Sequence, residues 1–130
     1  LTLGNSARFS GRADKAAFAY ALLRSRFPSD NRSALAAFEL ARIAFDMRGD
    51  HATAARWFRT YLKEQPGGAL AREAHGRLFE ALQRSGDAAG ARIEAERYLN
   101  AYPSGPHREA ARLLVSAESG GEVVDAGRPR

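Results

Sequence analysis

Cysteine is absent from this chain of 130 residues. Disulfides, thiolate metal sites and cysteine nucleophiles are therefore excluded, and the redox state of the compartment is left open. No apolar run approaches the roughly 20 residues that a membrane-spanning helix needs, and no signal peptide is visible. Histidine is scarce too, and His51, His75 and His107 never occur at the i, i+4 spacing of a metal-binding pair.

Motifs that would carry catalysis are also missing. The chain has no phosphate-binding loop and no serine in a nucleophile elbow. Glu94 and Glu96 are two residues apart, so on a helix they face different sides. Asp50 and Asp87 recur at predicted helix starts, where a capping role accounts for them. We therefore expect no enzyme, no metal site and no cofactor.

β-branched residues are few, whereas alanine, leucine, arginine and glutamate dominate, which favours helix throughout. The net charge of +5 lies in the first half, because residues 1–68 hold 11 basic and 6 acidic side chains and 69–130 hold 9 of each. An uneven basic surface can attract nucleic acid, which we keep as the alternative function. Against it, the arginines of this half point several ways around their predicted helices: Arg24, Arg26, Arg42, Arg48, Arg56 and Arg59.

One spacing recurs three times: glycine, then alanine five residues later, then proline twelve residues after that. It occurs as Gly11–Ala16–Pro28, Gly49–Ala54–Pro66 and Gly86–Ala91–Pro103. A period of 37 to 38 residues is typical of an array of helical hairpins. The glycine would turn the chain within each hairpin, the alanine would let the two helices approach closely, and the proline would end the second helix.

The predicted helices follow from this spacing. We expect repeats at about 1–30, 31–68 and 69–105, with helices over 32–48, 51–64, 70–84 and 88–101. The first repeat would hold the end of one helix, a turn at Gly11 and a second helix over 13–26, so we expect a fragment excised from a longer protein. A capping helix over 106–118 would turn Ala110, Leu113, Leu114 and Ala117 inward, and residues 119–130 would be a disordered tail.

The pattern resembles the tetratricopeptide repeat family. The matching positions are Leu3, Gly4, Gly11, Ala16, Tyr20 and Pro28; then Phe45, Gly49, Asp50, Ala54, Phe58, Leu62 and Pro66; then Leu82, Gly86, Asp87, Ala91, Leu99 and Pro103. The resemblance implies an all-α, right-handed superhelix of antiparallel hairpins. The connections Phe27–Asp30 and Tyr102–Gly105 resemble those of bacterial members in the Tol–Pal system and in outer-membrane barrel assembly. The stretches Glu39–Asp50 and Glu73–Asp87 resemble the C-terminal repeats of some anti-sigma-type regulators. A periplasmic or membrane-tethered parent is therefore favoured over a cytoplasmic one.

The resemblance also implies a function, namely the binding of a protein or peptide partner on the concave face. The residues it places there are Glu39, Arg42, Ile43, Asp46, Glu73, Arg77, Glu80 and Gln83. Trp57 would either pack against a neighbouring hairpin or serve as an exposed anchor for a partner. Self-association through apolar surface at the N-terminal edge is a second expected interaction.

Overall fold

The computed structural model describes the backbone of residues 2–127 and the side chains of residues 11–117, and it is helical throughout, without strands in that part. The elements are α1 (Thr2–Arg26), α2 (Asn31–Arg42), the π-helical segment η1 (Ile43–Met47), α3 (His51–Glu64), α4 (Ala71–Arg84), α5 (Ala88–Ala101) and α6 (Arg108–Gly127). The expected all-α class is therefore confirmed.

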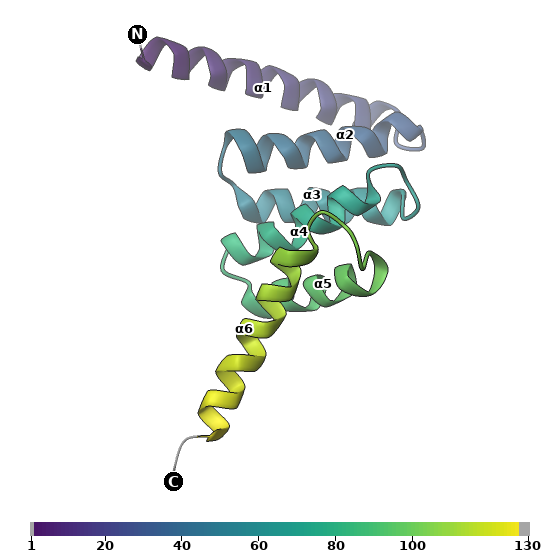
Figure 1. Cartoon of the computed structure of the whole chain (residues 1–130). Helices are drawn as coiled ribbons and strands as arrows, with labels where there is room; N and C mark the ends of the chain where they lie inside the picture. The colour runs from purple at the N-terminus through teal and green to yellow at the C-terminus, as the bar shows by residue number, and fades with distance from the viewer. Residues whose placement is uncertain (1, 128–130) are drawn as a thin grey trace.

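The helices form a stack in the order of the sequence. Each helix from α2 to α5 packs chiefly against the helix before it and the helix after it, and α1 and α6 lie at the two ends (Figure 1). α6 packs on α5 and then leaves the stack at an angle (Figure 1). Such neighbour-to-neighbour packing is the arrangement of a helical repeat array.

Two glycines make the turns inside the hairpins. Gly49 has φ +62° and Gly86 has φ +94°, which is the left-handed region that glycine enters without steric cost. The aspartate that follows each glycine caps the next helix: Asp50 accepts a hydrogen bond from the N–H of Thr53, and Asp87 from the N–H of Gly90. The predicted hairpin turns at these two positions are confirmed.

The predicted turn at Gly11 is wrong. α1 runs without interruption from Thr2 to Arg26, and Gly11 is not among the glycines with positive φ. The physical reason lies in the following residue. Arg12 stands where Asp50 and Asp87 stand in the other two cases, and arginine cannot accept a hydrogen bond from the N–H groups of a new helix. Without a cap, glycine disfavours the helix but does not end it.

The helix predicted over 32–48 is regular only to Arg42. From Ile43 to Met47 the turn widens, and the N–H of Arg48 donates to the carbonyl of Ile43 at 3.2 Å. The N–H of Asp50 then donates to the carbonyl of Ala44 at 2.8 Å, which closes the helix end. Sequence periodicity does not distinguish such a wide turn from a regular helix end.

Alanines lie where neighbouring helices come closest. Their side chains are fully buried at six positions of the main core cluster: Ala37, Ala41, Ala54, Ala74, Ala81 and Ala91. Large aromatic side chains fill the space between these contacts, with Phe38 packed edge-on against both Phe58 and Tyr61 at 5.6 Å between ring centroids. The core therefore runs continuously from α2 to α5.

The C-terminal helix differs from the expectation in two respects. α6 extends to Gly127, whereas a disordered tail is expected from residue 119; residues 128–130 lie outside the described part. Gly120 and Gly121 disfavour a helix by about 1 kcal/mol each without forbidding it. The inward face is also rotated: Ala111 is buried and Leu114 partly buried, while Leu113 is 63% exposed.

Candidate functional site

A groove of about 730 Å³ opens between α2, α4 and the connection that joins α3 to α4. Phe38 and Arg42 line it from α2, residues 66–70 from the connection, and Arg72, Glu73 and Arg77 from α4. Tyr102, at the end of α5, closes one side. The groove thus joins side chains from three separate stretches of the chain.

Arg77, which lines the groove from α4, also contacts the preceding hairpin. Its guanidinium contacts Asp46 at 2.6 Å and Glu73 at 3.7 Å, and it lies over the ring of Phe45 at 5.0 Å. Only 17% of its side chain is exposed. An arginine held by two carboxylates and an aromatic ring loses little further freedom when a ligand approaches.

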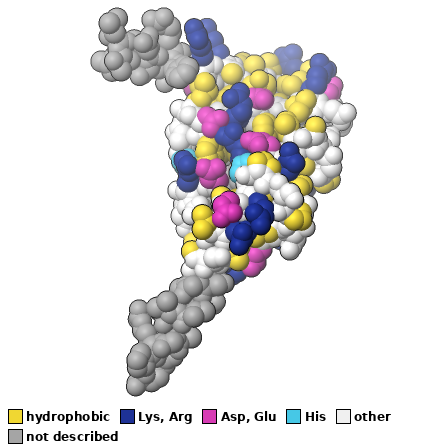
Figure 2. Space-filling model, viewed as in Figure 1, with side chains coloured by type: hydrophobic (Ala, Val, Ile, Leu, Met, Phe, Trp, Pro, Cys, Tyr) yellow, Lys and Arg dark blue, Asp and Glu magenta, His cyan; other side chains and the backbone are white. Residues whose placement is uncertain are grey.

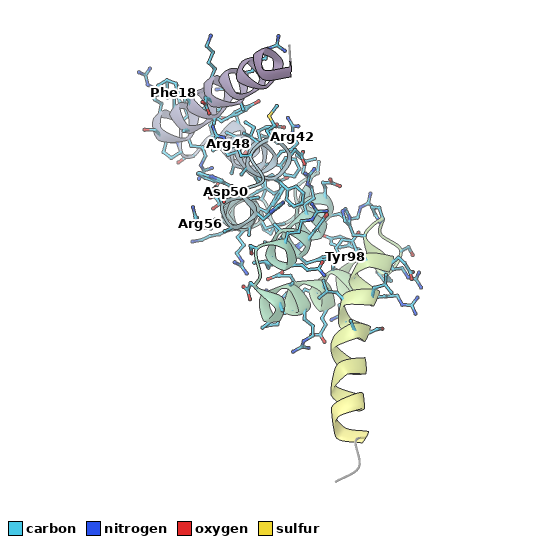
Figure 3. The ribbon with its side chains drawn as sticks, turned by 90° about the vertical axis from the view of Figure 1, so that its left-hand side faces the viewer. Phe18, Arg42, Arg48, Asp50, Arg56 and Tyr98 are labelled. Carbon is cyan, nitrogen blue, oxygen red and sulfur yellow. The ribbon has the colours of Figure 1, made fainter. Side chains whose placement is uncertain are left out.

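Arg42 is the more accessible cation. It forms an ion pair with Glu39 at 2.7 Å within α2, and its side chain is 45% exposed. The hydrogen bond to Glu39 raises the pKa of Arg42 above its ordinary value, so the charge is permanent. Figure 3 places Arg42 on the other side of the stack from Arg56. The groove therefore presents a cation beside carboxylates rather than a surface of one sign.

The structure brings together five of the eight residues predicted for partner binding. Arg42, Glu73 and Arg77 line the groove, Glu39 is paired with Arg42, and Asp46 is paired with Arg77. Glu80 and Gln83 lie further along α4, outside it. Glu80 contacts Arg84 at 2.8 Å, and Gln83 borders a second cavity.

Ile43 is the residue that the structure removes from the predicted set. Its side chain is only 3% exposed, so no partner can reach it in this conformation. α2 packs against α1 and α3, which leaves a narrow exposed arc along its length. Glu39, Arg42 and Asp46 fall on that arc, whereas Ile43 falls just beyond its edge.

A second cavity of about 450 Å³ lies between the turn joining α4 to α5 and the side of α6. Its lining is chiefly apolar, with Leu113 and Leu114 from α6 and Ala91 from α5. In the sequence, the feature that relates to this cavity is the amphipathic pattern of residues 110–117. That pattern predicts a buried face, and it does not reveal that the face is only half covered.

The histidines form no ligand cluster, and among the described residues no group of three metal-binding side chains comes together. His75 is half-buried beside Tyr102, and burial lowers its pKa below the ordinary value of 6.5. The Nδ1 atoms of His75 and His107 are buried without a hydrogen-bond partner in the described part of the chain. Both rings act as packing elements between α4, α5 and α6.

Trp57 is partly buried and packs against the main core cluster. The guanidinium of Arg24 lies 5.3 Å from its ring centroid, and the same arginine holds both carboxylate oxygens of Glu64, at 2.9 and 2.8 Å. Trp57 therefore takes part in the contact between α1 and α3, as the packing alternative predicts.

Charged side chains of both signs are interspersed on the face shown in Figure 2, without a continuous basic stripe there. Within residues 2–127, none of the helices combines the length and the apolar character that a membrane span requires. Comparisons with family models, with curated proteins and with solved structures find no match to this chain.

Proposed function

We propose that this chain is a non-enzymatic protein-interaction module built as a tetratricopeptide-like superhelix. Its partner would be an extended peptide segment that docks in the groove between α2 and α4. One observation carries the proposal: Arg42, Glu73 and Arg77, which the family resemblance implies on one face, line a single groove together.

The chemistry of the groove suits a peptide better than a small ligand. Its walls supply a cation at Arg42 and a carboxylate at Glu73, while Leu70, which is partly exposed, adds apolar surface. An extended backbone can satisfy both charges through its own amide groups and polar side chains, and one apolar side chain can enter between them. Most small-molecule pockets are more enclosed and more apolar than this one.

The wider role rests on two resemblances: that of the connections to bacterial envelope proteins, and that of residues 39–50 and 73–87 to anti-sigma-type regulators. On that basis the module belongs to a larger envelope protein or to an anti-sigma-like regulator. The partner would be a protein of the same assembly.

A photo-crosslinking experiment tests the groove. Benzoylphenylalanine replaces Arg72, an exposed residue that lines the groove, and in a control chain it replaces Arg59, an exposed residue of α3 outside it. Irradiation of cells of the source organism should yield a discrete crosslinked protein from position 72 alone. Equal crosslinks from both positions, or from position 59 alone, would overturn the groove as the docking site.

The alternative function is nucleic-acid binding through the basic half of the chain. The positive charge of residues 1–68 favours it. Titration with labelled single-stranded RNA at several salt concentrations tests it. Affinity that falls steeply as salt rises, by roughly 0.7 log units per log unit of salt for each phosphate neutralised, would support nucleic acid over protein as the partner.

A further inference from the structure

The outer face of α1 carries exposed apolar side chains that the fold does not cover. Phe18 is 71% exposed and Leu22 is 40% exposed, although both lie on a regular helix at the end of the stack. Figure 3 shows Phe18 at this end of the molecule. The opposite side of the same helix, with Ala13 buried and Leu23 partly buried, packs on α2.

The two apolar residues belong to a longer row of exposed side chains. Asp14, Phe18, Leu22 and Arg26 follow one another every four residues and are all exposed. Positions spaced by four form one ridge on a helix surface, so the four side chains lie in line. Along the helix the order of the four side chains is acidic, apolar, apolar, basic. In the reverse direction the order is basic, apolar, apolar, acidic, so each charge lies opposite its counterpart when two ridges run antiparallel.

A ridge of this kind is complementary to itself. We infer that the α1 ridge, defined as Asp14, Phe18, Leu22 and Arg26, docks against the same ridge of a second copy of this chain. In an antiparallel pairing Asp14 faces Arg26 of the second copy, and Phe18 faces Leu22. A two-fold axis relates the two copies, so every contact occurs twice.

The charges select this orientation over its reverse. A parallel pairing would place carboxylate against carboxylate and guanidinium against guanidinium, which is unfavourable. The ridges of two helices come alongside one another when the axes cross at about 50°, the commonest packing class. The crossing keeps the contact to the three turns from Asp14 to Arg26 and leaves the groove between α2 and α4 open.

The intramolecular contacts of the ridge are compatible with this pairing. Asp14 already contacts Arg48 of its own chain at 2.6 Å, yet its side chain remains 71% exposed. A carboxylate accepts several hydrogen bonds, so it can hold a second guanidinium. Among residues 11–117, Arg26 forms no ion pair.

Sedimentation velocity of the whole chain over a wide range of concentration tests the pairing. The expected result is a monomer–dimer equilibrium. Phe18→Asp should raise the dimer dissociation constant at least about tenfold, because it places a charge in the apolar centre. Leu113→Asp, a change of the same kind on α6, should leave it unchanged. A chain that stays monomeric, or a dimer that survives Phe18→Asp, would overturn the inference.

Charge exchange tests the orientation. Asp14→Arg and Arg26→Asp should each weaken the dimer, and the double variant Asp14→Arg/Arg26→Asp should restore it, because acid and base again face one another. Arg48→Gln is the matched control, since it removes the intramolecular contact of Asp14 and leaves the ridge intact. If the double variant remains as weak as the single variants, the antiparallel arrangement is wrong.

Discussion

The hydroxyl of Tyr61 accepts a hydrogen bond from the backbone N–H of Leu70 at 3.1 Å, across the connection between α3 and α4. The same contact recurs 37 residues later, where the hydroxyl of Tyr98 accepts from the N–H of His107 at 2.9 Å. Both tyrosine side chains are buried. Each hydroxyl therefore links the second helix of one hairpin to the start of the helix that follows it.

Tyr61→Phe should lower the free energy of unfolding by about 1–2 kcal/mol, because the N–H of Leu70 loses its partner in a partly buried position. Urea denaturation measures the change. Tyr102→Phe is the control, since no hydrogen bond involves its hydroxyl in the described part of the chain. Equal losses in the two variants would show that the recurring bond does not stabilise the connection.

A glycine makes room for each tyrosine hydroxyl. A Cβ atom at Gly68 would collide with the hydroxyl of Tyr61, and one at Gly105 would collide with that of Tyr98. Gly68→Ala should therefore destabilise the chain by more than Tyr61→Phe does. Gly67→Ala provides the comparison, because nothing lies within 4 Å of a Cβ atom at that position. Denaturation midpoints for the two alanine variants should separate clearly, and identical midpoints would contradict the collision.

Alanine substitutions at Gly11 and at Gly49 test whether α1 continues through Gly11 as a helix. Gly11→Ala should raise the free energy of unfolding by about 0.5–1 kcal/mol, because alanine favours a helix and nothing obstructs its Cβ atom. Gly49→Ala should lower it, because alanine is strained at φ +62°. Thermal and urea denaturation measure both. A loss of stability in Gly11→Ala would instead indicate a turn at this position.

The helix caps make stability depend on pH in the acid range. The hydrogen bonds of Arg32 lower the pKa of Asp30 from 3.8 to about 2, and the bonds from Thr53 lower the pKa of Asp50. A depressed carboxylate pKa means that the unfolded state binds more protons, so stability is complete above about pH 4 and is lost as the pH falls toward the folded pKa.

The double variant Asp30→Asn/Asp50→Asn keeps the caps without titrating. Its loss of stability below pH 4 should be shallower than that of the parent chain, and parallel curves would contradict this account.

His75 should add a second pH dependence at higher pH. Burial lowers its pKa below 6.5, so the unfolded state again binds the extra proton and stability falls as the pH drops below 6.5. His75→Gln removes the titration while keeping a polar side chain of similar length. Its stability should change less than that of the parent between pH 7 and the folded pKa of His75. His51→Gln, at the start of α3, serves as the control substitution.

The hairpin turns illustrate what could be predicted from the sequence. At Gly49 and Gly86 the signal is local, because one residue needs positive φ and the next caps a helix. The all-α class follows equally from composition and period. Gly11 shows the limit of a spacing rule, since the pattern repeats there without the cap that gives the glycine its effect. The π-helical turn that begins at Ile43 could not be predicted, because a single wide turn leaves the spacing of apolar residues almost unchanged.

The groove between α2 and α4 and the α1 ridge show which features the sequence predicts and which depend on tertiary packing. The sequence, through its resemblance to tetratricopeptide repeats, predicted Arg42, Glu73 and Arg77 on one face, and the three residues line one groove. Only packing decided that Ile43 is buried and that Leu113 and Phe18 are exposed. Burial depends on how close a neighbouring helix comes, and that distance is set by side chains far away in the sequence.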